Sequence, residues 1–165
     1  DLAPEDNAGA AHIGTIEFNS STLYRYSTIT VCELYKQLKD DTIVSVREFV
    51  RAFVYSMPTG KQNTFANRTL PYAVLVTVRT DQPVNLVGAY ENPVPPGDNG
   101  YEVASAEKLI NHAKNLYKDF SGEPAYSLVT GNLLHELGVE KPFPELLNEL
   151  EAELSKRLQD CEGEK

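Results

Sequence analysis

Apolar and polar residues alternate along the chain with two periods, and each period predicts a different kind of element. Residues 12–18 and 23–31 show the two-residue alternation of strands. From residue 45 the apolar positions 46, 49, 50, 53, 54 and 57 follow the spacing of one helix face. Ser45 and Glu48 form the Ser-x-x-Glu pattern of a capping box, so we expect this helix to begin at Ser45 and to end before Pro58 and Gly60.

Further elements follow in the second half of the chain. Residues 72–78 form a nearly continuous apolar run, which predicts a strand covered on both faces, and residues 84–90 predict its hairpin partner across Asp81-Gln82-Pro83. The Pro- and Gly-rich residues 93–100 predict a surface loop. Residues 104–120 predict a helix with Phe120 on its inward face, residues 126–130 a short strand, and residues 144–158 a helix with one leucine-rich face.

This order of elements predicts the α+β fold class, with helices on one face of a mostly antiparallel sheet. A chain of 165 residues is long enough for one domain with a substantial core. We expect residues 1–22 to be a flexible lead-in, residues 23–141 the main part of the domain, and residues 142–165 a C-terminal leucine helix with a polar tail. The chain begins at Asp1 and its only methionine is Met57, so we expect it to be part of a longer protein.

Charge is unevenly distributed along this acidic chain. The net charge is -9, but between Thr42 and Thr80 five basic residues stand against the single acid Glu48, and from Glu102 onward 13 acids stand against 7 bases. Binding to phosphate depends on the field within roughly 8 Å at physiological salt. A basic surface can therefore coexist with an acidic C-terminal half, although chance scatter of charge in an ordinary acidic protein gives the same counts.

The two cysteines and the lack of a long apolar run indicate the cellular compartment in which the protein acts. Cys32 and Cys161 lie far apart, and neither a disulfide framework nor a metal site is expected from them. No run is long enough to span a bilayer and the first residues do not resemble a signal peptide. We expect a soluble protein of the reducing cytoplasm that does not bind membranes.

The loop between residues 60 and 71 carries the clearest candidate chemistry. It follows a glycine and combines an ammonium, a guanidinium and amide side chains, all of which bind phosphate oxygens. Such contacts position RNA without reading its sequence. A solvated polar loop is the alternative. The candidate residues in this loop are Lys61, Gln62, Asn63, Thr64, Asn67 and Arg68.

Four blocks in a fixed order carry a resemblance to a known family: AHIGTIEFNSSTLYRYSTITV, a helix, the GKQNTF loop, and AVLVTVRTDQPVNLVGAYENPV. In this order they resemble the C-terminal half of the CasC-type backbone subunit of type I-E CRISPR Cascade, and weaker similarity extends to the last helix. The resemblance implies a ferredoxin-like palm, similar to an RNA recognition motif, that lacks its N-terminal half. The Lys/Arg-Gly-aromatic pattern of a genuine RNA recognition motif is absent from the sequence.

The resemblance also implies further RNA-binding residues. His12, Thr15 and Phe18 lie where the family's chain returns from the thumb that presses on the guide, and a histidine satisfied by backbone is the alternative for His12. Arg25 stands between Tyr24 and Tyr26, so it is suited to lie on a base or to pair with a phosphate. An ion pair of Arg25 with Glu17 is the competing interpretation.

Nothing in the sequence predicts catalysis. No G-x-S-x-G, P-loop or H-E-x-x-H motif is present, and His112 and His135 have no partner at ligand spacing, so we expect no enzyme activity, cofactor or metal. The resemblance implies a structural subunit that binds crRNA, other copies of itself and other Cascade subunits, and that reaches target DNA through the guide. A free-standing acidic α+β protein-interaction module is the rival hypothesis.

Overall fold

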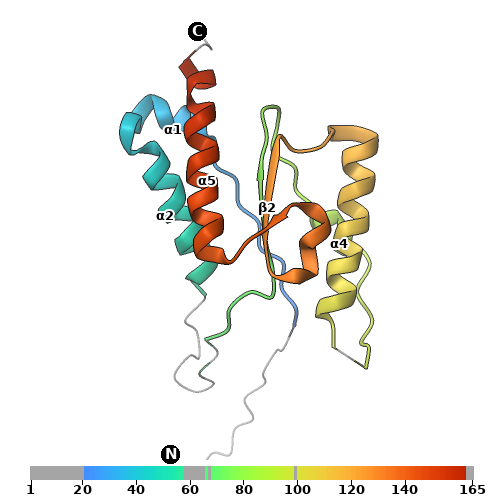
Figure 1. The fold of residues 1–165 in the computed structure, drawn as a ribbon. Helices are drawn as coiled ribbons and strands as arrows, with labels where there is room; N and C mark the ends of the chain where they lie inside the picture. Colours follow the sequence, from blue (N-terminus) through green and yellow to red (C-terminus); the bar gives the residue numbers. More distant parts are fainter. Residues whose placement is uncertain (1–20, 58–65, 67, 99, 163–165) are drawn as a thin grey trace, which may run out of the picture.

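The computed structural model describes residues 21–57, 66, 68–98 and 100–162. It is an α+β structure with two helical layers around a small sheet (Figure 1). The helices and strands are α1 (Val31–Leu38), α2 (Thr42–Tyr55), β1 (Val74–Val78), α4 (Glu102–Leu116), β2 (Tyr126–Thr130), β3 (Val139–Glu140) and α5 (Phe143–Arg157). Short 3-10 or π turns occur at η1 (Lys39–Asp41), η2 (Val87–Tyr90), η3 (Tyr117–Ser121), η4 (Asn132–Leu137) and η5 (Leu158–Glu162).

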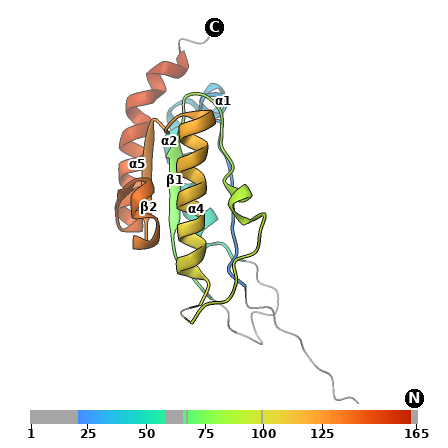
Figure 2. The ribbon, with the colours of Figure 1, turned by 90° about the vertical axis from the view of Figure 1, so that its right-hand side faces the viewer.

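The sheet has three strands in the order β1-β2-β3. β1 pairs antiparallel with β2, with Val76 opposite Leu128, and β2 pairs in parallel with the two-residue β3. β1 is thus an edge strand of the described sheet. The extended residues 21–30 run on the side of β1 away from β2 (Figure 2). Tyr24 packs into one apolar cluster and Ile29 into the other, so this segment is anchored on both sides of the sheet.

Two apolar clusters fill the space between the sheet and the helices. Val129 and Leu75 face α4, whereas Leu128 and Val76 face α2 and α5. Because neighbouring strand residues point to opposite faces, both faces of the sheet are covered. The α+β class is confirmed, but the expected placement of helices on one face is wrong, since α4 and α5 lie on opposite sides (Figures 1 and 2).

The helices form where the apolar period predicts them. α5 buries its leucine face in the cluster shared with α2, and α4 buries Leu109, Ile110 and Ala113 against the sheet. The helix predicted over residues 104–120 is confirmed in its body. Its end differs, because η3 closes the element as a π turn before Gly122, and Phe120 is 89% exposed instead of facing inward.

Two predicted strands have other conformations. Residues 84–90 do not pair with β1, whose partner is β2. Their buried residues Leu86 and Ala89 are three apart, which is the period of the 3-10 turn that η2 forms against α4. Residues 23–30 have no regular structure and α1 begins at Val31. The first predicted strand, residues 12–18, lies outside the described residues.

The start of α2 also differs from the prediction. The helix begins at Thr42, one turn before Ser45, and no side-chain hydrogen bond caps its first turn. Glu48 accepts hydrogen bonds from Arg47 and Arg51, so its carboxylate does not reach back to the helix terminus. The capping box is therefore wrong, and the two arginines fix Glu48 on the helix surface.

A disulfide joins the first and last helical regions. Cys32 in α1 is bonded to Cys161 in η5, with 5.1 Å between the two Cα atoms and a sequence separation of 129. The expectation that these cysteines stay unpaired is wrong. Their spacing in sequence gave no sign of the pairing, because only the packing of α1 against the end of α5 brings them together (Figure 1).

Candidate nucleic-acid interface

The structure describes two of the ten predicted RNA-binding residues, Arg25 and Arg68. The other eight lie outside the described residues: His12, Thr15, Phe18, Lys61, Gln62, Asn63, Thr64 and Asn67. The RNA-binding assignment of all ten residues stays a prediction. The surroundings of the two arginines and the described ends of the loop show what the surface there can do.

Arg25 holds the end of α2. Its Nη1 donates to the Ser56 carbonyl at 2.9 Å and contacts Met57 Sδ at 3.6 Å. Ser56 is the C-cap of α2, where helix carbonyls carry partial negative charge, so a cation is favourable there. Ser56 and Met57 also lead into the segment that contains the predicted loop. The contact places a guanidinium at the base of that loop.

The guanidinium of Arg25 also lies over an aromatic ring. Its Cζ is 4.3 Å from the Phe53 ring centroid, and Phe53 stacks on Phe49 with 6.2 Å between centroids. Among the described residues, Nε and Nη2 have no hydrogen-bond acceptor. The expected ion pair with Glu17 involves a residue outside the described chain, whereas the predicted flat stacking occurs on a phenylalanine of the protein itself.

Two aromatic residues that the sequence pattern places in the core lie at the surface instead. Phe49 was placed in the core stripe of α2, yet it is 44% exposed and continues the stack from Phe53. Tyr72 was placed in a buried strand, but it precedes β1 and is 68% exposed. The i, i+4 spacing of the two phenylalanines indicates that they are neighbours on one helix face, but it carries no signal that Phe49 is exposed.

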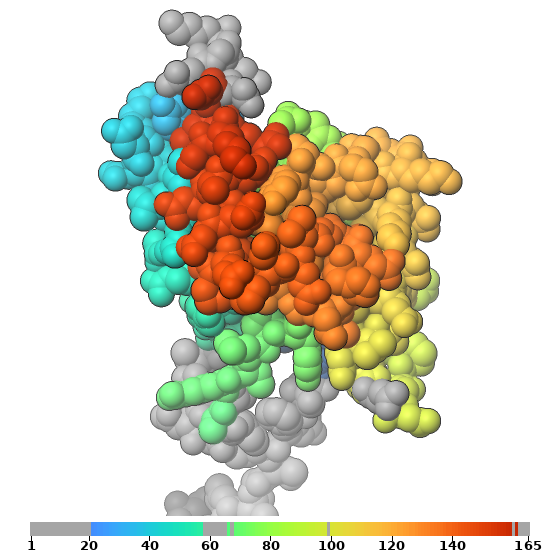
Figure 3. Space-filling view, in the orientation of Figure 1, coloured from blue at the N-terminus to red at the C-terminus, as the bar shows by residue number. Residues whose placement is uncertain are grey.

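Arg68 lies in the described part of the chain that leads into β1. It is exposed, and its backbone N–H donates to the Ala66 carbonyl at 2.8 Å. Residues 68–72 project at the end of the molecule opposite the C-terminus (Figure 3). The C-terminal end of α2 lies at the same end of the molecule (Figure 1).

Three of the five basic residues between Thr42 and Thr80 are engaged in ion pairs. Arg51 pairs with Glu48 at 2.6 Å, and the hydrogen bond from Arg51 is the main cause that lowers the pKa of Glu48. Arg47 pairs with Glu48 at 2.8 Å and lies 3.3 Å from Glu151 on α5. Of the other two basic residues, Arg68 is exposed and Lys61 lies outside the described residues.

The third of these residues, Arg79, is a structural residue. Its side chain is 7% exposed and binds Asp81 at 2.7 Å. Nη2 also donates to the Ser121 carbonyl at 2.6 Å, so the guanidinium ties the end of β1 to η3. The hydrogen bond from Arg79 lowers the pKa of Asp81 to about 2. An arginine held by this many partners is not available to a phosphate.

The C-terminal half presents acids along α5. Glu153 is mostly buried, and hydrogen bonds from Arg157 first and then Lys156 lower its pKa. Glu149 accepts a hydrogen bond from the Tyr126 hydroxyl at 3.0 Å, which ties α5 to β2. Several of the acids counted in the sequence are therefore structural, and they lie on the side of the sheet that carries α5 (Figure 1).

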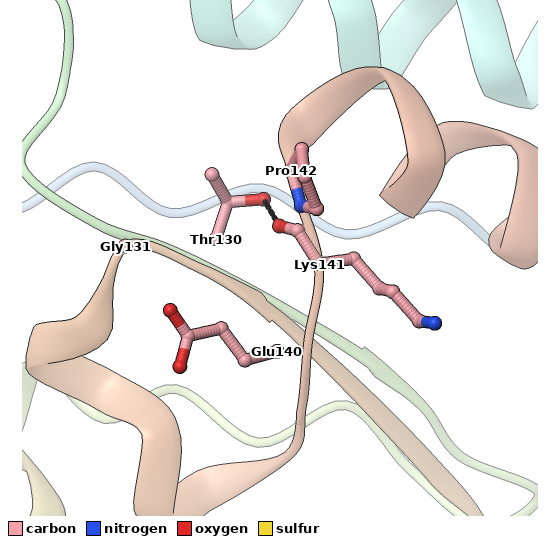
Figure 4. A pocket seen from close by; sticks show the side chains of 5 residues that line it. All are labelled: Thr130, Gly131, Glu140, Lys141 and Pro142. Carbon is pink, nitrogen blue, oxygen red and sulfur yellow. Dashed lines mark hydrogen bonds between the residues drawn. The ribbon is translucent and has the colours of Figure 1, made fainter.

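A hollow of about 420 Å³ lies between the ends of β2 and β3 (Figure 4). Thr130, Gly131, Glu140, Lys141 and Pro142 line it, and the Thr130 hydroxyl donates to the Lys141 carbonyl at 2.8 Å. The Glu140 carboxylate and the Lys141 ammonium point in different directions. In the part of the chain that the structure describes, no group of three His, Cys, Asp or Glu residues is arranged to hold a metal ion.

The described helices include none long and apolar enough to cross a membrane. At the end of the molecule that carries residues 68–72, Arg68 and the ring of Tyr72 are exposed. The fold places the chain in the class of α+β domains with a small mixed sheet covered by helices on both faces.

The chain belongs to the CT1975-like protein family, whose sequence model matches residues 1–151. Searches of curated proteins give no significant match. Among solved structures, the fold is similar to a chain of a CRISPR RNA-guided surveillance complex, with a TM-score of 0.70, 27% identity and 76% of this chain covered. A chain of a pre-nicking CRISPR RNA-guided surveillance complex matches with a TM-score of 0.68, 28% identity and the same coverage. This chain spans 50% and 39% of the length of those two chains.

Proposed function

We propose that the chain is part of a structural subunit of a CRISPR RNA-guided surveillance complex and acts by binding rather than by catalysis. The similarity to chains of two such complexes, at 27% and 28% identity over 76% of this chain, is the observation that carries the proposal. The family match over residues 1–151 supports the same assignment from sequence. The finer proposal is a crRNA-binding backbone subunit of type I-E Cascade, which would act in the cytoplasm in antiviral defence.

In this proposal the polar loop and its neighbours hold the guide by its phosphates. Lys61 and Arg68 supply the charge that is not consumed by the ion pairs of Arg47, Arg51 and Arg79. Gln62, Asn63, Thr64, Asn67, His12 and Thr15 add hydrogen-bonding groups, and Phe18 and Arg25 add contacts to bases or phosphates. Contacts to phosphate do not depend on base identity, so sequence is read by pairing between the guide and target DNA.

Other copies of the chain and other Cascade subunits are the proposed protein partners. A head-to-tail contact between copies that does not close on itself gives a helical filament, which is the geometry required to follow an extended guide. The two similar chains are longer than this one, which spans 50% and 39% of their length. The remaining part of such a protein would supply additional RNA and subunit contacts.

The salt dependence of RNA binding tests the site. The variant Lys61→Glu/Arg68→Glu should weaken binding to unrelated single-stranded RNAs equally, and the log-log salt slope should fall by about 0.7 to 1 for each lost phosphate contact. Lys118→Glu/Lys141→Glu makes the same change in net charge at two positions on the acidic half whose ammonium groups form no ion pair with the described residues, and it should leave the slope unchanged. Equal effects of both double variants would show that total charge, and not this surface, governs binding.

The rival assignment is an acidic protein-interaction module. One observation favours it, namely that Arg47, Arg51 and Arg79 are all paired with acids, which leaves little free positive charge on the described surface. A module of this kind would bind a basic protein. It would show no salt-sensitive RNA binding, whether or not Lys61 and Arg68 are substituted. RNA binding that is lost in the loop variant and retained in the control variant excludes it.

A further inference from the structure

The Cys32–Cys161 disulfide lies where it can open without disturbing either core. α1, which carries Cys32, has no buried residue, and η5 contributes none to the two buried clusters. Both cysteines are partly exposed. Val31 and Leu34 pack only at the margin of the cluster formed by α2 and α5. The covalent bond therefore holds two peripheral elements, while the sheet and helices α2, α4 and α5 have their own packing.

We propose that Cys32 and Cys161 form a reversible redox clasp between α1 and the end of α5. In the oxidised state the bond fixes α1 and the extended residues 21–30 that precede it. In the reduced state α1 and η5 separate from each other while both apolar clusters persist. The clasp rests on the cytoplasmic location included in the proposed function, since disulfides in reducing compartments are usually of the redox-responsive kind. Partial exposure of both cysteines gives a small thiol access to both sulfurs.

The chemistry requires a low-molecular-weight disulfide, such as glutathione disulfide, as the oxidant. The thiolate of one cysteine attacks this disulfide, and a mixed disulfide forms while one glutathione thiolate leaves. The thiolate of the second cysteine then displaces the second glutathione. One S–S bond is broken and one is formed, two electrons pass from the protein to the oxidant, and the two cysteine protons pass to the released glutathione thiolates.

The clasp has a structural consequence for the segment that precedes α1, because Cys32 lies in the first turn of the helix. The helix follows directly on residues 21–30, in which Arg25 binds the C-cap of α2 and Tyr24 binds Asn85 and the Leu86 N–H. Because α1 lacks buried residues, the disulfide contributes much of what restrains it. The bond joins residues that are 129 positions apart in sequence, so it strongly lowers the conformational entropy of the state in which α1 is detached. Reduction should thus increase local opening of α1 without global unfolding.

Two measurements on the 165-residue chain test the proposal. Thiol trapping and mass spectrometry across glutathione buffers of increasing oxidised fraction should show a reversible change from two free thiols to one disulfide. Hydrogen exchange should show amides of α1 opening at least about tenfold faster after reduction, with α4 and β2 unchanged. In Cys32→Ser/Cys161→Ser, α1 should exchange at the reduced rate whether or not reductant is present.

Specific outcomes would overturn the clasp. A pair that stays fully oxidised in excess reduced glutathione is a permanent structural bond, and a pair that stays reduced in glutathione disulfide does not form. Equal exchange of α1 in both redox states would show that the bond restrains nothing. Faster exchange of α4 and β2 together with α1 would indicate global unfolding. None of these readouts involves RNA, so they are independent of the proposed function.

Discussion

A position favours glycine when its φ is positive or when a Cβ would meet neighbouring atoms, and three glycines of this chain allow the two reasons to be separated by experiment. Gly122 has a φ of 68° and nothing lies within 4 Å of the position that a Cβ would occupy. Gly138 has extended backbone, but a Cβ there would lie 2.7 Å from the Ser127 carbonyl oxygen. Gly131 combines both features, with a φ of 87° and only 2.4 Å between a Cβ and the Tyr72 carbonyl oxygen.

Each feature has a cost that can be estimated for an alanine substitution. Gly122→Ala places a side chain at a positive φ, which costs about 2 kcal/mol of the free energy of unfolding. In Gly138→Ala the new methyl group would overlap with the Ser127 carbonyl in β2, so the turn before β3 has to move away from β2. Overpacking of this kind also costs about 2 kcal/mol. Gly131→Ala incurs both costs, so we expect about 4 kcal/mol.

Thermal and urea unfolding of the three variants measure these values. For a chain of this size about 2 kcal/mol lowers Tm by roughly 4–8 °C, and Gly131→Ala should lower it by roughly twice as much. Urea midpoints should move in the same order with an unchanged slope. If Gly131→Ala were no more destabilising than either of the other two variants, the contact between Gly131 and the backbone before β1 would not be as close as the structure shows.

Two more predictions concern Arg79 and the end of α4. The pKa of Asp81 is about 2 in the folded protein and 3.8 in a free carboxyl. The ionised carboxylate therefore stabilises the fold fully above about pH 4, and this stabilisation is lost as the pH falls toward 2. Asp81→Asn should remove this part of the acid dependence of the urea midpoint. Tyr117→Ala should cost about 3–5 kcal/mol because the ring is buried, whereas Phe120→Ala should change stability by less than about 0.5 kcal/mol. Equal losses from Tyr117→Ala and Phe120→Ala in urea unfolding, or an unaltered acid transition in Asp81→Asn, would contradict these assignments.

The disulfide and the ion pair between Arg47 and Glu151 show two limits of inference from sequence. Cys32 and Cys161 are 129 residues apart, and their pairing depends on how α1 meets the end of α5. The count of basic residues between Thr42 and Thr80 suggested a basic surface, but Arg47 reaches Glu151 on α5, more than a hundred residues away in sequence. Charge counted along a chain does not show which charges neutralise one another in space.

The sequence by itself determined the elements whose side chains repeat with a clear period. The apolar stripes of α2, α4 and α5 and the apolar runs of β1 and β2 were each identified within a few residues, because burial of one face imposes its period on the sequence. The α+β class followed from their order. The resemblance in four ordered blocks indicated the relationship to CRISPR complexes that the similar structures support.

The tertiary structure alone decided how those elements combine. In the predicted strand over residues 84–90, Val87–Tyr90 form a 3-10 turn because Leu86 and Ala89 meet α4. β1 takes as its partner β2, which lies about fifty residues further along the chain. The covering of both sheet faces, the burial of Arg79 and the exposure of Phe120 likewise depend on contacts between distant residues. Local periodicity specifies which face of an element is apolar, whereas the choice of the partner for that face depends on the packing of the whole chain.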